Sequence, residues 1–402
     1  MSARLKARLH DVLVNLAAHP VAFPLARLSP RLSPLHRVPG VGVVVNDAEL
    51  AHDILGRDRD FTKNGPGSLA AVFTQAMGPF ALSNMDGEAH RELRSRLGDL
   101  LSPARCEGLL SACRGPLDEG AGALVAGAEV DLVRMMRTLS GRLTMAMIGV
   151  VSPPEGERAT DEAAREVFAL GERIAAALRF APLPEEALRP VQGDIDRLTR
   201  MARESYASAA LPETSLMHRL REMGMPVEEA RGVISIFFIA GALTTAVALP
   251  RIVALLVDSE QMAGLGDDAD RVARAIDEGL RFTTPVPATV RVAQRDAEVR
   301  GRRIRGGSRV VILTSNLARD AALFPDPHRF DAARVHDARA RYLWYGAGPH
   351  FCFGFPLAQR ELRLALGVLA ALPGRLRIVR RRAARGVLLP SYARLVVRLE
   401  GR

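Results

Sequence analysis

Cysteine is scarce in this chain, and its cysteines do not form the pattern of a disulfide framework. The 402 residues include three cysteines, an odd number that favours a reducing compartment, so we expect a cytoplasmic protein. Cys106 and Cys113 lie seven residues apart on a stretch with helical spacing. They lack the spacing of a metal site, so we interpret both as buried side chains that only fill space in the core. The third, Cys352, lies in a glycine-rich turn.

Long apolar runs are also absent from the N-terminal stretch. His10, Asp11 and Asn15 interrupt its apolar residues and Pro20 ends them. The run falls short of the roughly 20 residues that span a bilayer, so we expect no transmembrane segment. No cleavage signal is evident. The pattern predicts a helix packed on the domain, with an amphipathic helix lying on a membrane surface as the alternative.

Aromatic residues are few, with one tryptophan and four tyrosines, and the apolar residues are mostly alanine, leucine and valine, which favours helix. The formal net charge is +10 and is carried mainly by arginine. These arginines are scattered without an aromatic-interleaved patch, so we expect no nucleic-acid partner. We interpret them as solvated surface and internal ion pairs. A basic face for an acidic protein partner is the second interpretation.

The turn around Cys352 is the most informative stretch. Gly346 and Gly348 precede the cysteine, Gly354 follows it, and a helical pattern starts at Pro356. The N-terminus of a helix stabilises a thiolate, and glycines let the backbone approach a flat ligand closely. His350 adds an N–H donor for an anion. These features suit a heme iron with its propionates, and a buried structural cysteine is the alternative.

The same stretch resembles the heme-binding loop of cytochromes P450, an aromatic residue followed by Gly-x-Gly-x-His/Arg-x-Cys-x-Gly. Tyr345 stands where the family usually has phenylalanine. The resemblance implies that Cys352 is the proximal metal ligand of heme b (iron protoporphyrin IX). It also implies cofactor contacts from the rest of the loop: Tyr345, Gly346, His350, Phe353 and Gly354.

Two further segments could bind an anion if the resemblance to cytochromes P450 holds. His90 and Arg94 are four residues apart in a predicted helix and therefore share a face, although a solvated helix face is the commoner meaning of such a pair. The resemblance implies that this pair holds a heme propionate. It assigns a second propionate contact to Arg291.

Residues 228–258 form a long apolar pattern that predicts a helix, and Pro250 should bend or end it. A threonine in such a run usually bonds the carbonyl four residues back. The segment resembles the oxygen-binding kink of the P450 central helix. This implies a heme contact at Ala240 and an oxygen site that includes the catalytic candidates Gly241, Thr244 and Thr245. Leu243 occupies the place of the family's acid and cannot carry a proton, so water or another residue replaces it or the reaction departs from ordinary hydroxylation.

Residues 268–281 read as an amphipathic helix that contains Glu278 and Arg281, a pair three residues apart that can share a face. Exposed pairs of this kind are common and contribute little. The resemblance implies instead a buried structural pair behind the heme.

The expected fold is mainly α-helical with small β-sheets, the cytochrome P450 fold, as a single domain over 1–402. Residues 1–40 would be an N-terminal helix and an irregular proline-rich lead-in, and 41–402 the heme-binding core. The sequence further predicts helices at 49–55 and through most of 104–225, strands at 41–45, 292–299 and 309–314, a hairpin of 375–379 with 393–399, and a loop-rich stretch over 56–85.

The resemblance implies a monooxygenase that hydroxylates or epoxidises an apolar terpenoid, steroid, fatty-acid or polyketide-like molecule. It would use O2 and electrons from a separate ferredoxin and ferredoxin reductase, and act as a monomer. Arginines that flank the cysteine loop could meet the acidic ferredoxin: Arg339, Arg341, Arg360 and Arg363. Residues expected near the substrate are Phe80, Leu82, Phe237, Leu243, Pro287, Ala288 and Val290, with 174–184 as a roof. Two alternatives stay open: an atypical heme-thiolate enzyme that uses peroxide or performs coupling or rearrangement, and a heme protein that binds ligand without turnover.

Overall fold

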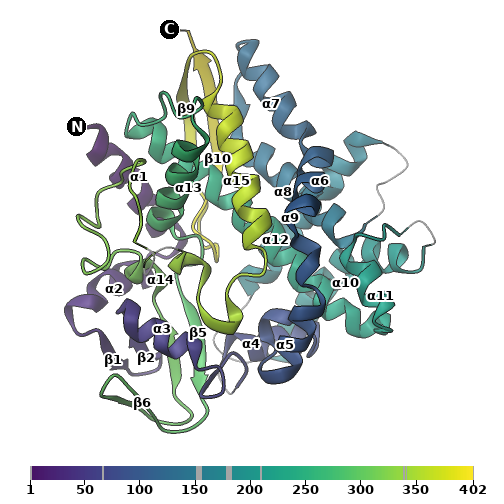
Figure 1. Ribbon diagram of the computed structural model, residues 1–402, viewed down its shortest axis with the longest axis vertical. Coiled ribbons are helices and arrows are strands. Elements are labelled where there is room, and N and C mark those ends of the chain that lie inside the picture. Colours follow the sequence, from purple (N-terminus) through teal and green to yellow (C-terminus); the bar gives the residue numbers. More distant parts are fainter. Residues whose placement is uncertain are drawn as a thin grey trace.

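The structure is a computed structural model that describes residues 2–65, 68–150, 156–177, 183–208, 211–337, 340 and 342–401. Helices fill the centre and right of Figure 1, and the larger sheet lies at the lower left beside the first helices. The helices are α1 Ala3–Ala18, α2 Ala22–Leu28, α3 Ala48–Gly56, α4 Leu69–Met77, α5 Gly87–Arg96, α6 Pro103–Cys113, α7 Gly115–Val125, α8 Leu132–Ile148, α9 Glu157–Ala177, α10 Glu185–Tyr206, α11 Leu216–Glu222, α12 Val227–Asp258, α13 Ala269–Thr283, α14 Thr314–Leu317 and α15 Phe355–Ala370.

Three small sheets complete the fold. Their strands are β1 Leu35–Val38, β2 Gly42–Val45, β3 Phe61–Thr62, β4 Val130–Asp131, β5 Thr289–Ala293, β6 Ala297–Val299, β7 Arg302–Ile304, β8 Arg309–Ile312, β9 Arg375–Ala383 and β10 Tyr392–Glu400. The five-stranded sheet has the order β1-β2-β8-β5-β3, and only β2 and β8 pair in parallel within it. The hairpin of β9 and β10 carries β4 at its edge, which confirms the expected C-terminal hairpin.

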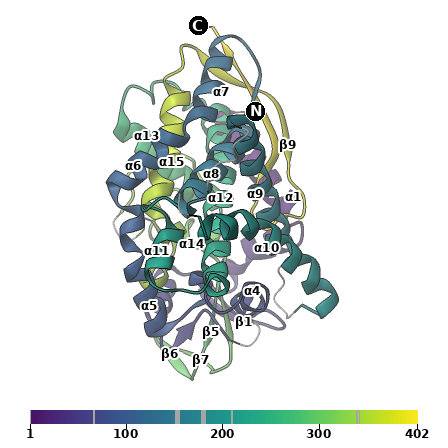
Figure 2. The same ribbon diagram turned by 90° about the vertical axis from the view of Figure 1, so that its right-hand side faces the viewer.

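Helix α12 forms the centre of the molecule. It is apolar on all sides and packs against α8, α9 and α1, as a fully enclosed helix should (Figure 2). It is long and apolar enough to cross a bilayer, but 83% of its most apolar window is buried inside the protein. Among the residues that the structure describes, no other helix passes that test. Pro250 lies inside α12 and does not end it, because buried side chains on both sides of the proline hold the helix in place.

The N-terminal helix α1 packs on the domain, as expected. Ala7, Val14 and Ala18 are buried, and Asp11 accepts a hydrogen bond from Arg251 of α12 at 2.6 Å. Both members of this ion pair are buried, so α1 is fixed to the central helix by charge as well as by apolar contact.

Two predictions of irregular structure were wrong. Residues 24–40 include α2 and the edge strand β1, since Pro24 is tolerated in the first turn of a helix and an edge strand needs only one partner. Residues 56–85 include α4, whose start is fixed by Ser68 accepting a hydrogen bond from the amide of Ala71. The predicted strand 292–299 is interrupted, because β5 ends and β6 begins on either side of residues 294–296.

Candidate cofactor site

The cysteine loop runs from a short 3-10 turn to the N-terminus of α15. Gly346 and Gly348 adopt φ values of +82° and +67°, the left-handed region that favours glycine. A Cβ at Gly348 would lie 2.2 Å from the carbonyl oxygen of Leu55, so only glycine lets the loop lie against α3. The amide of Cys352 donates to the carbonyl of Tyr345 at 3.0 Å, which closes the turn.

The sulfur of Cys352 faces donors. The pKa of the thiol is raised by burial, while amide hydrogen bonds from Gly354 and Phe355 and the charge of Arg94 act to lower it. A positive ion bound to the sulfur would overcome the effect of burial, because a coordinated thiol is deprotonated. The loop therefore presents a sulfur that is suited to ligate a metal.

Basic side chains gather beside this loop. The rings of His90 and His350 stack with centroids 4.1 Å apart, and Nε2 of His350 lies 3.3 Å from Oδ1 of Asp86. Arg94 donates to the carbonyl of Phe351 at 2.6 Å. The helical face that carries His90 and Arg94 is thus turned toward the cysteine loop and not toward solvent.

Lys63 and Arg291 belong to the same basic cluster. Burial and the charge of Arg291 lower the pKa of Lys63 to about 7, and burial lowers the pKa of Arg291 to about 10. In the described part of the chain, Asp86 is the carboxylate that offsets them. It also accepts hydrogen bonds from the amides of Lys63 and Asn64.

This excess of cationic groups indicates a place for anions. Burial and the charges of His350 and Arg94 also lower the pKa of His90 to about 4, and its Nδ1 is buried without a hydrogen-bond partner. Two carboxylates of a bound group would supply the missing acceptors and charge. The donor set therefore fits heme propionates, and the sulfur of Cys352 fits the iron.

Helix α12 presents an uncovered patch near this loop. Phe237 meets Phe353 edge-on with ring centroids 5.4 Å apart, which places this part of α12 beside the cysteine loop. One turn further on, Ala240 is exposed and Gly241 and Thr244 are half-buried, although most other residues of this part of α12 are buried. The hydroxyl of Thr244 donates to the carbonyl of Ala240 at 2.9 Å, the bond expected for a threonine inside a helix.

The neighbouring residues of α12 face other helices. A Cβ at Gly241 would lie 3.0 Å from the hydroxyl of Thr144, so the glycine allows a close approach of α8. Leu243 is buried against α9, where a Cβ added to Gly171 would lie 2.6 Å from its Cδ1. The position that carries an acid in the resemblance is therefore filled by a leucine in an apolar helix contact.

Thr245 belongs to a buried polar triad that the sequence analysis did not find. Its hydroxyl lies 3.1 Å from that of Ser140 on α8, and Ser140 donates to Glu361 of α15 at 2.5 Å. Burial raises the pKa of Glu361 to about 7, while hydrogen bonds from Ser140 and Thr245 lower it. The triad joins three helices and holds a carboxyl that binds a proton readily near neutral pH.

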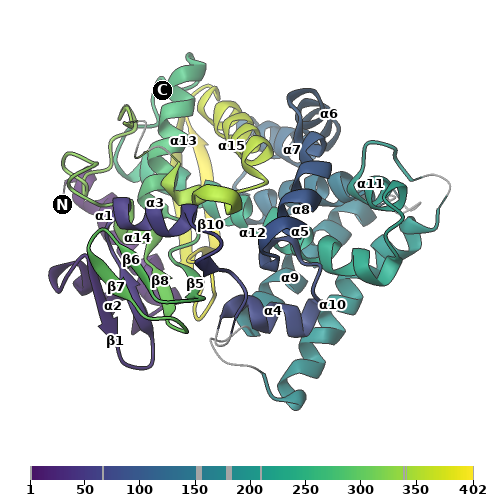
Figure 3. The same ribbon diagram turned by 60° about the horizontal axis from the view of Figure 1, so that its bottom comes forward.

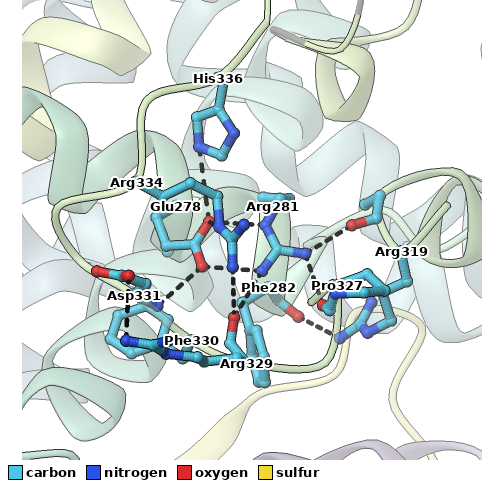
Figure 4. Close-up of polar contacts among 12 residues, drawn as sticks. Glu278, Arg281, Phe282, Arg319, Pro327, Arg329, Phe330, Asp331, Arg334 and His336 are labelled. Carbon is cyan, nitrogen blue, oxygen red and sulfur yellow. Dashed lines mark hydrogen bonds and ion pairs between the residues drawn. The ribbon is translucent and has the colours of Figure 1, made fainter. Parts of the chain in front are cut away.

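Glu278 and Arg281 form a fully buried pair on α13 (Figure 4). Arg281 makes two parallel hydrogen bonds to the carboxylate, at 2.7 and 2.8 Å. It also donates to backbone carbonyls of the following meander, at Ala318, Pro327 and Arg329. Arg334 adds a second cation 3.2 Å from Glu278. The pair fastens the meander before the cysteine loop to α13.

The residues expected near the substrate lie on different elements of the structure. Phe80 and Leu82 lie on a segment that crosses α12 at Gly232, where a Cβ would contact the backbone of residues 77–81. Pro287 and Ala288 are half-buried and Val290 is buried in β5. Of the expected roof, residues 178–182 lie outside the described residues.

Lys63, Asp86 and Glu361 are the residues that sequence reasoning missed. Asp86 and Glu361 stand inside segments that drew attention for other residues, and their acid type was the available signal. Lys63 had no such signal, because its loop meets the site only through tertiary packing.

The comparisons with known proteins concern the family and the fold. Residues 272–369 match the family model described as cytochrome P450. The cytochrome P450 monooxygenase PikC of Streptomyces venezuelae is 29% identical over 71% of this chain and 66% of its own length. A cytochrome P450 140 of Mycobacterium tuberculosis, described as putative, is 40% identical over 34% of this chain and 31% of that protein. The chain thus spans about a third of the length of the mycobacterial relatives it matches.

Solved structures show the same architecture along nearly the whole chain. CYP109B1 from Bacillus subtilis superposes with a TM-score of 0.76 at 22% identity, covering 95% of this chain and all of that one. P450BioI, solved in complex with an acyl carrier protein, reaches a TM-score of 0.79 at 21% identity, covering 96% and 99%.

The fold is therefore that of cytochromes P450, with a cysteine loop below a long central helix. Its residues 272–369 match the cytochrome P450 family model, and the relatives named above are bacterial members of that family.

Proposed function

We propose that the protein is a monooxygenase that hydroxylates or epoxidises an apolar small molecule. The observation that carries this proposal is the meeting of the Cys352 loop, the basic cluster and the uncovered patch of α12. Heme b, when bound, supplies activation of O2 and insertion of one oxygen atom into a C–H or C=C bond. In the proposed arrangement Cys352 ligates the iron, while Lys63, Arg94 and Arg291 bind the propionates.

Thr244 is the proposed proton-positioning residue. Its hydroxyl donates to the carbonyl of Ala240, which leaves its oxygen lone pairs free to accept a hydrogen bond from a water molecule. Ala240 has only a methyl side chain, so a flat group and a small ligand can lie close to this part of α12. The apolar faces of Phe80 and Phe237 support an apolar substrate.

A second candidate function follows from Leu243. Its side chain fills a contact with Gly171 and cannot supply protons, so an atypical activity with peroxide, or oxidative coupling or rearrangement, is the alternative. Glu361 is a buried carboxyl joined to the adjacent Thr245 through Ser140. The position of Glu361 supports the first proposal, ordinary hydroxylation, with Glu361 supplying protons in place of the family's acid that Leu243 replaces.

We further propose a cytoplasmic monomer that receives electrons from a separate ferredoxin and its reductase. Of the four arginines expected to meet the ferredoxin, Arg360 and Arg363 lie on α15, whereas Arg339 and Arg341 lie outside the described residues. Among relatives, 6-deoxyerythronolide B hydroxylase of Saccharopolyspora erythraea is 39% identical over 29% of this chain and 28% of its own length. Its name supports a polyketide-like substrate as one of the proposed classes.

The test starts from heme-loaded protein and a panel of apolar molecules screened for a spin-state shift. Molecules that bind are then incubated either with a bacterial ferredoxin, its reductase, NADPH and O2, or with hydrogen peroxide alone. The proposal expects oxygenated product under the first condition, with less product per electron for Thr244→Ala. Product with peroxide alone would favour the atypical enzyme. No product under either condition would favour a ligand-binding protein.

A further inference from the structure

An uncovered apolar face lies along the first two helices. Thirteen large apolar side chains are exposed among the described residues, and seven of them fall within the first 32 positions. These seven are Leu5, Leu9, Leu13, Val21, Leu25, Leu28 and Leu32. Figures 1 and 3 both place α1 and α2 together at one edge of the molecule, away from α10 and α11. Such a concentration marks an interaction surface.

Helix α1 is apolar on two opposite faces. Its inner face buries Ala7 and Val14 against the domain. Leu5, Leu9 and Leu13 follow one another at intervals of four residues and therefore share the outer face. A helix that only packs on a domain normally carries polar residues there. The outer leucines are 42–55% exposed, so much of their apolar surface is left uncovered by the domain.

Helix α2 is still less covered, because none of its seven residues is buried. Leu25 is 63% exposed, and Leu32 just beyond the helix is 73% exposed. Leu25 and Leu28 are three residues apart on α2 and share a face of the helix, and Val21 and Leu32 are exposed apolar residues at its two ends.

A basic hollow of about 290 Å³ adjoins these leucines. Its lining residues are Leu5, Ala7, Arg8, Ser259, Phe282, Asp326, His328, Arg329 and Phe330. Arg27 of α2 lies 3.5 Å from the ring nitrogen of His328, which places a further guanidinium at its edge. Arg319 lies behind the wall, where it bonds to the carbonyl of Phe282 at 2.5 Å (Figure 4).

Four arginines surround the hollow, and its carboxylates balance them only in part: Asp326 is a lining residue, and Arg329 pairs with Asp331 at 3.5 Å. Asp11 is held by Arg251 at 2.6 Å and lies 3.9 Å from Arg319, so its charge is already shared. The pKa of Arg27 is lowered, first by burial and also by the charge of Arg8. Burial and the neighbouring arginines lower the pKa of His328 to about 4. An anion in the hollow would relieve this repulsion.

We propose that the outer faces of α1 and α2 and the basic hollow dock on an anionic phospholipid bilayer. The leucines enter the boundary between headgroups and acyl chains, and a lipid phosphate enters the hollow among Arg8, Arg27 and Arg329. Aliphatic side chains flanked by cations are the pattern of helices that lie in a membrane surface. The protein would then be bound peripherally, with α12 remaining in its core.

Charge decides between this occupant and a second copy of the chain. A symmetric dimer through this face would bring the same arginines of both copies together, which is repulsive. A free phosphate ion would satisfy the hollow but would leave the leucines in water. A bilayer with anionic headgroups is the partner that covers both parts of the face.

The experiment is flotation of the heme-loaded protein with vesicles at low salt. One set contains phosphatidylcholine with phosphatidylglycerol, and the other contains phosphatidylcholine alone. The expected result is binding to the anionic vesicles that falls steeply with salt. Leu25→Ser should weaken it about tenfold, because a leucine leaves the acyl boundary. Arg27→Gln should weaken it about fivefold.

Matched controls separate this face from general stickiness. Val125→Ser on α7 removes a similarly exposed apolar side chain, and Arg158→Gln on α9 removes a similarly charged one; both should bind like the unaltered protein. Equal losses in controls and test variants, or absence of binding to anionic vesicles, would overturn the proposal. So would a dimer in gel filtration that Leu25→Ser dissociates, or saturation of the hollow by inorganic phosphate without vesicle binding. Folding of each variant is checked by its retained heme absorbance.

Discussion

Replacing Glu361 by glutamine should remove a pH dependence from the stability of the fold. This carboxyl is buried between three helices, and burial raises its pKa from 4.5 to about 7. Because the folded pKa is the higher one, the folded protein holds its proton over a pH range in which the unfolded chain has released it. Stability contributed by the neutral carboxyl is therefore full below pH 4.5 and is lost as the pH rises through 7.

The size of the effect follows from the two pKa values. Once the carboxyl is ionised in both the folded and the unfolded protein, the free energy of unfolding is about 3 kcal/mol lower than at low pH. About 2.5 kcal/mol of this loss occurs between pH 5 and pH 8. Glutamine keeps the shape of the neutral acid and can still accept a bond from Ser140. Relative to the unaltered protein, Glu361→Gln should therefore gain about 2.5 kcal/mol in free energy of unfolding on going from pH 5 to pH 8.

The assay is denaturant unfolding of the heme-loaded protein at both pH values. Glu186→Gln, at an exposed position of α10, makes the same chemical change and provides the baseline to subtract. An infrared difference spectrum between Glu361→Gln and the unaltered protein at pH 6 should show the stretching band of a protonated carboxyl. A stability difference that does not change with pH, together with no such band, would refute the reasoning.

Other predictions concern the supporting contacts of the site. Glu278→Gln should lower the free energy of unfolding by about 3–5 kcal/mol, because Arg281 keeps its buried charge without a countercharge; a loss below about 1 kcal/mol in thermal unfolding would contradict this. Gly171→Ala should cost about 1–3 kcal/mol by crowding Leu243. Adding Leu243→Ala should recover part of that loss, and strictly additive effects in the double-mutant cycle would show that the two do not touch. Lys63→Gln should speed transfer of heme to apomyoglobin about tenfold, since one charged partner of the propionates is lost; an unchanged rate would remove Lys63 from the heme site.

The cysteine loop and the central helix were predictable because their signals are local. The glycines around Cys352 lie in one short stretch of sequence, residues 346–354, and the all-round apolar composition of α12 needs no partner to be recognised. The face shared by His90 and Arg94 follows from helix geometry alone. These features identified the architecture and the elements that meet at the site.

Contacts between distant segments could not be predicted in the same way. The triad that contains Glu361 joins residues on α8, α12 and α15, and no spacing within one segment predicts it. Sequence also fails to tell which way each residue of α12 points. Gly241 faces α8 and Leu243 faces α9, whereas Ala240 is left uncovered. Only the packed helices around α12 determine those directions.

The reduced carbon monoxide spectrum tests the central claim most directly, because the position of its Soret band reports the atom bound to the iron opposite the gas. Protein loaded with heme b should show the band of a thiolate-ligated heme, and Cys352→His should move it to the position of histidine ligation. A histidine-type band in the unaltered protein, or a thiolate-type band that persists in Cys352→His, would contradict the account.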